Sequence, residues 1–244
     1  MRDREDRHFS KTVRAIGEGY SIPNDTTAHL QASSRPQTCT VQGVTDFQHL
    51  IDLVYPDLFT ADSSSFADRG ILAPTNTSTD EINAHILNLL QNTSYSLKSA
   101  DKLSRVLEHC QRSWCPPSYL RPQRCVVMFI RNINFDCGIV NGRKGIVRSI
   151  SSRIVDVHII ADGSPLVKIP RITFEVQVGR NGLSFHRQQF PLRVCHAITI
   201  NKSQADFIQG SVGLDLPDDV FCHGQLYVAL SRTTSSRNVM TLVM

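Results

Sequence analysis

Apolar residues at helical spacing predict two amphipathic helices in the first ninety residues. The first stripe repeats at i, i+3, i+4 and i+7 and consists of Phe47, Leu50, Ile51 and Val54. A capping-box pair, Thr45 with Gln48, opens it and Pro56 closes it. The second stripe follows a Ser78 and Glu81 pair and consists of Ile82, Ile86, Leu89 and Leu90. Between them, "RGILAP" predicts a short buried strand, so the segment has the strand, loop and helix order of a parallel α/β sheet.

The middle of the chain changes to short β-type runs. They are "RCVVMFIRN", "GRKGIVRSI", "RIVDVHII", "LVKIPRITFEV" and "LSFHRQQFPLRV", separated by "NG", "ADG" and "RNG" turns. This spacing is typical of a small antiparallel β-barrel.

The α/β pattern returns after this region. "VCHAITINKSQ" predicts a strand that ends in a polar loop, and "VFCHGQLYVALSR" predicts a helix with Leu226, Ala229 and Leu230 turned inward. "NVMTLVM" predicts a closing strand. We therefore expect an α/β domain interrupted by a small antiparallel β-barrel, while residues 1–44 show no clear pattern.

Charge is distributed unevenly. Residues 121–202 hold 13 Lys or Arg against 4 Asp or Glu, a net charge of +9 in a chain whose net charge is +4. A basic region joined to an acidic remainder indicates a surface for a polyanion, although an arginine-rich solvated face has the same composition.

Composition favours a soluble intracellular protein. The charged start "MRDREDRH" lacks the apolar run of a secretory signal, and the longest apolar run, "VVMFI", is too short to span a membrane. Seven cysteines at irregular spacing indicate reduced thiols that fill the core. A zinc site at His109, Cys110 and Cys115 is the alternative, but no second ligand pair follows, so we predict no metal site.

No nucleotide-binding loop is found in the sequence. G-x-x-x-x-G-K-[ST] is absent, and "GIVNGRKG" has the wrong spacing and is better explained by a hairpin turn at Asn141 and Gly142. Arg232, at the end of the last predicted helix, nevertheless has the position of a phosphate ligand. A cation that complements the helix dipole is the structural alternative.

Several ordered motifs carry a family resemblance. "FPLRVCHAITINKSQ", "VGLDL" and "VFCHGQLYVALSR" resemble the last motifs of the petite-integration-frequency family of superfamily-one DNA helicases, which includes the helicases of Helitron transposons. "LAPTN…DEIN", "SYSLKSAD", "VVMFIRNIN…GIVNG" and "IPRITF" agree in order. The resemblance covers most of residues 68–244 and, more weakly, "FSKTVRAIGEG" before them. It implies the second of two RecA-like, P-loop-NTPase-type lobes, with an inserted small barrel.

The resemblance implies a function and its residues. The family hydrolyses ATP between two lobes and moves 5′ to 3′ along single-stranded DNA, in repair, recombination or telomere maintenance. Arg232 resembles the arginine finger, and Asn76, Gln204 and Tyr227 are expected to line the nucleotide cleft. For the DNA-binding face we expect, from the resemblance and from their polar or basic side chains, Thr75, Thr199, Asn201, Lys202, Ser203, Arg131, Asn141, Arg171 and Arg187, with Asn132 and His186 as further candidates.

The same resemblance divides the chain and limits its activity. We expect an inter-lobe connector at 1–67, the second lobe at 68–94 and 191–244, and the barrel region at 95–190. ATP and Mg²⁺ are expected only where a separate P-loop lobe is supplied, so the isolated chain should be inactive. The resemblance places the protein in the nucleus or mitochondrion.

One motif departs from the family pattern. Ala205, Asp206 and Phe207 replace the family's "GQT" after "TINKSQ", which indicates weakened coupling of ATP to DNA. A non-catalytic module that binds single-stranded DNA or a protein, derived from a helicase, is the alternative function.

Overall fold

The chain divides into two units. The computed structural model describes residues 6–19, 42–44, 46–58, 66, 68–90, 95–97, 100–102, 118–120, 125–160, 166–178, 183–205, 208, 210–216 and 224–242. Residues 1–89 together with 196–244 form one unit, here called the sheet unit, and residues 90–195 form the other, here called the inserted unit.

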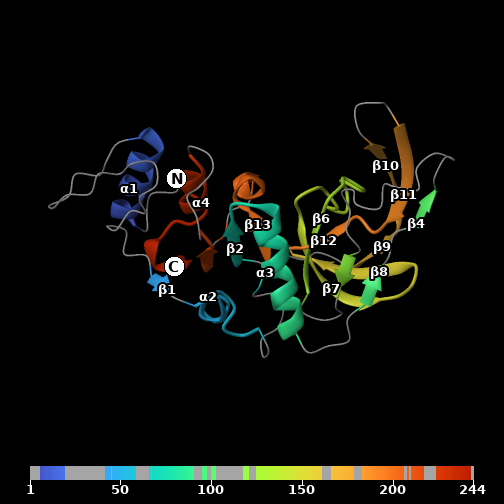
Figure 1. Ribbon diagram of the computed structural model, residues 1–244, viewed down its shortest axis with the longest axis horizontal. Coiled ribbons are helices and arrows are strands. Elements are labelled where there is room, and N and C mark those ends of the chain that lie inside the picture. The colour runs from blue at the N-terminus through green and yellow to red at the C-terminus, as the bar shows by residue number, and fades with distance from the viewer. Residues whose placement is uncertain are drawn as a thin grey trace. The chain divides into compact units, whose positions relative to one another are not determined.

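Five parallel strands form the centre of the sheet unit (Figure 1). Their order is β1 (Gln42–Val44), β15 (Val239–Leu242), β14 (Val212–Leu214), β2 (Gly70–Ala73) and β13 (Ala197–Thr199). Every residue of β2, β13 and β14 is buried. Continuous burial is expected of a parallel sheet that is covered on both faces. The chain leaves this sheet after α3 and returns to it at β13, as predicted.

Two helices pack on the sheet. α2 (Phe47–Val54) contacts β14 and β15, and α3 (Asn76–Leu89) contacts β2 and β13. Leu50, Ile51 and Val54 of the predicted first stripe are fully buried. α2 comes so close to β14 that a Cβ on Gly213 would lie 2.9 Å from Val54 Cγ2, so only glycine fits there without a shift.

The helix starts differ from the sequence prediction. α2 has Asp46 at its N-cap rather than Thr45, and Gln48 donates to Asp52 instead of closing a capping box. α3 begins at Asn76, before the predicted Ser78 cap, because the Thr75 hydroxyl accepts the Ser78 backbone N–H. These caps are set by the backbone path out of the preceding element, which a motif search does not include.

Two further helices of the sheet unit, α1 (Arg7–Glu18) and α4 (Gln225–Leu230), pack against each other. The segment assigned to a connector contains α1, as well as β1 and α2. α4 is shorter than the helix predicted over "VFCHGQLYVALSR". Asp6 caps α1 by accepting the Phe9 N–H and also accepts the Ser236 hydroxyl, from the start of η3 (Ser236–Asn238). The chain's first helix is thereby tied to residues near its last strand.

The inserted unit is antiparallel throughout the described strands. One sheet has the order β12 (Leu192–Val194), β6 (Val126–Phe129), β7 (Lys144–Ile150), β8 (Ile154–Ile159) and β9 (Leu166–Pro170). A second has the order β10 (Ile172–Val178), β11 (Leu183–Gln189) and β4 (Ala100–Lys102), and a third pairs β3 (Tyr95–Leu97) with β5 (Ser118–Leu120).

The predicted β-type runs of the middle region are strands in the structure. The two longest runs each contain two strands, separated at Arg171 and at Phe190 with Pro191. Gly142 has φ +88°, which confirms the predicted turn after Asn141. Of the described cysteines, Cys125 and Cys195 are buried, as expected of thiols that fill a core, whereas Cys137 is exposed in the loop after β6, against that expectation. Over the part of the chain that the structure describes, we find no helix long and apolar enough to cross a membrane.

Candidate nucleotide and nucleic-acid site

The carboxyl ends of β2 and β13 bring two of the sequence motifs together. Thr199 pairs in register with Ala73, so the loop that begins α3 and the 3-10 helix η2 (Ile200–Ala205) leave the same edge of the sheet. Ligands of open α/β sheets bind at this edge. Lys202 Nζ lies 3.4 Å from Asn76 Oδ1, and both side chains are exposed. Thr75 is half-buried, and its hydroxyl is engaged at the start of α3.

The "TINKSQ" motif presents only part of its polar side chains. Asn201 and Lys202 are exposed, whereas Thr199 is 8% exposed and Ser203 is fully buried. The Ser203 hydroxyl donates to the Ile200 carbonyl at 2.7 Å and so stabilises the turn of η2. Gln204 lies in η2, but its side chain is outside the described residues, as are Asp206 and Phe207.

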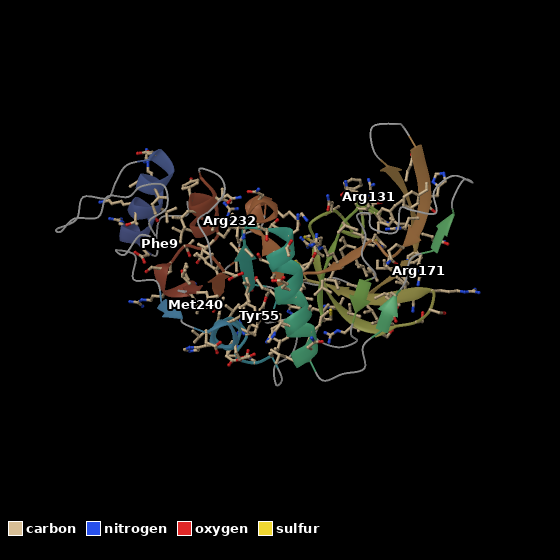
Figure 2. All side chains as sticks on the ribbon, viewed as in Figure 1. Phe9, Tyr55, Arg131, Arg171, Arg232 and Met240 are labelled. Atoms are coloured by element: carbon tan, nitrogen blue, oxygen red, sulfur yellow. The ribbon has the colours of Figure 1, made fainter. Side chains whose placement is uncertain are left out.

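Arg232 connects the end of α4 to η2. Its Nε donates to the Val228 carbonyl at 2.9 Å and its Nη1 to the Ser203 carbonyl at 3.0 Å. Its Nη2 lies 2.8 Å from the Ser231 hydroxyl oxygen. The residue is only 9% exposed, and the backbone carbonyl of Arg232 accepts the Ile208 N–H. Figure 2 labels this side chain within the sheet unit. The guanidinium is therefore a structural tie to the predicted DNA motif.

Tyr227 lies on the exposed side of α4. It is 40% exposed, and a Cβ built on Gly17 would lie 2.7 Å from its Cδ2 atom. The ring therefore lies against α1, where the absence of a side chain at Gly17 makes room for it.

Sequence reasoning missed an amide that holds β13. Asn83 is 5% exposed, and its side chain donates to the Ala197 carbonyl and accepts the Ala197 N–H, both at 2.9 Å. β13 is an edge strand, so the carboxamide replaces the neighbour that an inner strand would have. The available signal was a polar residue within the apolar stripe of α3.

Two buried titratable groups were also missed. His196 is fully buried beside Tyr55, whose hydroxyl donates to the His196 carbonyl at 2.6 Å. Burial lowers the pKa of His196 to about 3. Asp215, which directly follows β14, is 7% exposed, and burial, with a smaller contribution from Glu81, raises its pKa.

The inserted unit gathers arginines on aromatic rings. The Arg131 guanidinium lies over Phe174 at 5.6 Å, and Phe174 pairs in register with Arg187. Arg187 is 5% exposed and lies over Phe185 at 5.2 Å. Among these residues Arg131 is the exposed cation, because Arg187 is part of the interior.

The remaining candidates of this unit lie in different settings. Arg171 is half-buried over Phe190 at 4.7 Å, and its Nη1 lies 3.4 Å from Gln189 Oε1. Asn141 is exposed, and its backbone N–H donates to Asn132 Oδ1 at 2.7 Å. His186 is exposed on β11.

No cluster of metal ligands occurs among the residues that the structure places. The described ranges contain no group of three or more His, Cys, Asp or Glu side chains suited to a metal ion. The alternative zinc ligands His109, Cys110 and Cys115 lie outside those ranges.

Sequence comparisons find relatives among the helicases. No family model matches the chain. The chain is 32% identical over 155 residues to the ATP-dependent DNA helicase PIF1 of Mus musculus, and the matched stretch covers 60% of this chain and 22% of the relative. It is 34% identical over 111 residues to the ATP-dependent DNA helicase Pif1 of Campylobacter jejuni, which covers 42% of this chain and 24% of the relative. The matches therefore span about a quarter of these relatives' length or less.

Solved Pif1 structures share the fold. The Pif1 helicase of Candida albicans superposes with a TM-score of 0.65 at 22% identity, over 100% of this chain and 55% of that one. The Pif1 helicase of Bacteroides in complex with ADP-AlF3 and single-stranded DNA gives 0.63 at 22% identity, over 99% and 50%. The predicted resemblance and the α/β fold class, with its RecA-like lobe, are thereby confirmed. The chain is related in sequence to part of the Pif1 ATP-dependent DNA helicases and has the fold of one portion of their solved structures.

Proposed function

We propose that the chain is the C-terminal portion of an ATP-dependent DNA helicase that moves 5′ to 3′ on single-stranded DNA. The observation that carries the proposal is the connection of Arg232 to the carbonyl of Ser203 within the "TINKSQ" motif. The side chain that is the predicted phosphate ligand therefore also contacts the predicted DNA-binding segment. Repair, recombination or telomere maintenance, in the nucleus or mitochondrion, is the biological role and location that the family resemblance suggests.

The proposed chemistry divides between two lobes. ATP with Mg²⁺ supplies the phosphoryl group, and a P-loop that these 244 residues do not contain would have to hold it. An arginine finger accelerates phosphoryl transfer by about 10³ to 10⁵ only when the γ-phosphate is already positioned. Arg232 can offer its Nη atoms to a phosphate while its Nε stays on the Val228 carbonyl of its own helix. Asn76, Gln204 and Tyr227 are proposed to line the same cleft.

The geometry suggests how nucleotide and DNA communicate. If Nη1 turns to a phosphate, the Ser203 carbonyl loses its donor, and η2 is free to shift. Asn201 and Lys202, two exposed residues of η2, would move with it and change their contacts to the DNA backbone. A cation and an amide at this place bind phosphate oxygens without reading bases, as a translocating motor requires.

The binding part of the proposal is tested on the isolated chain. Fluorescence anisotropy with a labelled oligo-dT of about 20 nucleotides should give salt-dependent affinity, with log Kd rising with log salt by about 0.7 per phosphate contact. Lys202→Ala should weaken binding and lower that slope by about one contact. Lys168→Ala is the matched control, because Lys168 is an exposed lysine of the inserted unit that faces Asp156. A response that is flat between about 50 and 200 mM salt would refute DNA binding.

The catalytic part is tested by adding the other lobe. The isolated chain should not hydrolyse ATP. When the P-loop lobe of a Pif1 relative is supplied, DNA-stimulated hydrolysis should appear, and Arg232→Lys should abolish it. Hydrolysis by the isolated chain that Arg232→Ala leaves unchanged would refute the role of the finger.

A non-catalytic module that binds single-stranded DNA or a protein is the second candidate function. Two observations favour it: Arg232 is only 9% exposed, and Ala205 stands where the family has glycine. Salt-dependent DNA binding without any ATPase activity after addition of the P-loop lobe would support this candidate.

A further inference from the structure

The loop between β6 and β7 exposes an aromatic side chain. This segment, residues 131–143 and here called the Phe135 hairpin, closes on a bridge between Asn134 and Ile139. Phe135 is 73% exposed, more than any other large apolar side chain that the structure describes, and Ile133 is 37% exposed. Exposure of a phenylalanine at a loop tip leaves most of its apolar area in water, which indicates a surface for a ligand rather than for the core.

Backbone hydrogen bonds hold the Phe135 hairpin in one shape. The Ile139 N–H donates to the Asn134 carbonyl at 2.8 Å, and the Gly138 N–H donates to the Phe135 carbonyl at 3.0 Å. Asn134 Oδ1 accepts the Cys137 N–H at 3.2 Å, and Gly138 adopts φ +69°. The tip is therefore organised before any ligand arrives, which lowers the entropy lost on binding.

Cations and amides flank Phe135 along the chain. Arg131 and Arg143 are exposed at the two ends of the hairpin, and Lys144 follows directly. Asp136 is the one acidic residue within 131–144. Figure 2 labels Arg131 in the inserted unit, where its guanidinium is supported by the ring of Phe174. A protein partner that covered Phe135 with an apolar surface would not need these cations. A nucleotide, in contrast, needs an aromatic face for its base and a nearby cation for its phosphate.

We propose that Phe135 is a stacking platform for an unpaired base of single-stranded DNA, with Arg131 and Arg143 on the adjacent phosphates. The proposal rests on the DNA binding proposed above and adds to it a contact to a base. Stacking accepts any base, because every base has a π face, so the contact is compatible with movement along the strand. A protein partner that covers the ring is the competing occupant.

The first test compares two single substitutions. Phe135→Ala should weaken binding of oligo-dT to the full chain on the order of ten-fold, with an unchanged salt slope. Leu166→Ala is the matched control, because Leu166 is an exposed apolar residue of the same unit at 54% exposure. Equal affinity of the Phe135 and Leu166 variants would overturn the stacking. Absence of any binding by the unsubstituted chain would overturn the proposed DNA binding as well.

The second test removes the bases instead of the ring. On an abasic oligodeoxynucleotide of the same length, Phe135→Ala and the unsubstituted chain should bind equally. An equal loss on both oligonucleotides would overturn the proposal, because the ring would then act through the phosphates or through the fold.

A third measurement observes the contact directly. Phe135→Trp should keep the affinity, and its indole emission should be quenched by oligo-dT but not by the abasic strand. The unsubstituted chain, with its single Trp114, provides the background emission. Emission that is insensitive to oligo-dT at saturation would place the ring away from the bases and refute the stacking.

Discussion

Replacement of Arg232 should destabilise the folded protein, whether or not the residue also acts in catalysis. In Arg232→Ala, the carbonyls of Val228 and Ser203 lose donors that lie at 2.9 and 3.0 Å, and the Ser231 hydroxyl loses its neighbour at 2.8 Å. Hydrogen bonds to a charged group contribute about 1.5–3 kcal/mol each, and the residue is only 9% exposed. Because such contributions overlap and water reaches part of the new space, we expect a total loss of about 2–4 kcal/mol in the free energy of unfolding.

Urea denaturation followed by circular dichroism measures this loss. The midpoint should fall while the slope m stays unchanged. Arg232→Lys should recover less than half of the loss, because an ammonium group cannot reach all three acceptors in the geometry of a guanidinium. Arg237→Ala is the matched control, since Arg237 is exposed in η3 and should change stability by about 0.5 kcal/mol or less. A midpoint for Arg232→Ala equal to that of Arg237→Ala would refute the argument that this guanidinium ties α4 to η2.

Three further predictions concern the frame that positions the site. Asn83→Leu should cost about 2–3 kcal/mol, because both backbone groups of Ala197 lose their partner; thermal unfolding compared with the exposed control Asn88→Leu checks this. Burial lowers the pKa of His196 from 6.5 to about 3, so between these pH values the imidazole is protonated in the unfolded chain and neutral in the folded chain. The free energy of unfolding should therefore fall by about 1.4 kcal/mol for each pH unit below about pH 6.5, down to about pH 3. Urea midpoints at about pH 7 and 5 should therefore differ less in His196→Gln than in the unsubstituted chain, and equal differences would contradict the assignment. Gly213→Ala should cost about 1–3 kcal/mol, because the new Cβ would lie 2.9 Å from Val54 Cγ2; an unchanged urea midpoint would show that α2 can move away from β14.

Local sequence patterns were sufficient to predict those elements whose form depends only on residues close together in the chain. The buried run at Ile71, the stripe of α2 and the turn at Asn141 are short-range features, so they were predictable from spacing and turn chemistry. α1 was missed because residues 1–44 lack a long apolar stripe. Among the residues of α1 whose burial is described, Phe9, Thr12 and Val13 are buried, and one of these three is polar.

The candidate site was predictable in its residue types and motif order, but not in its contacts. Ser203 is 29 residues from Arg232, and Asn83 is 114 residues from Ala197. Partners this distant are chosen by the order of strands in the sheet, which a local pattern does not contain. The same limit applies to Arg187 and Arg131, which look alike in the sequence although only Arg131 is exposed.

The sequence by itself determined most of the strands and helices after residue 44, that an antiparallel region interrupts a parallel one, and which helicase motifs the chain contains. Only the tertiary structure decided that Arg232 is bonded to η2, that Ser203 is buried and Lys202 exposed, and that Phe135 stands in solvent on a preformed hairpin. The reason is physical. The spacing of apolar residues shows which side of one helix or strand faces the core and which faces water, whereas the burial and hydrogen bonds of a given side chain depend on which distant segment packs against it.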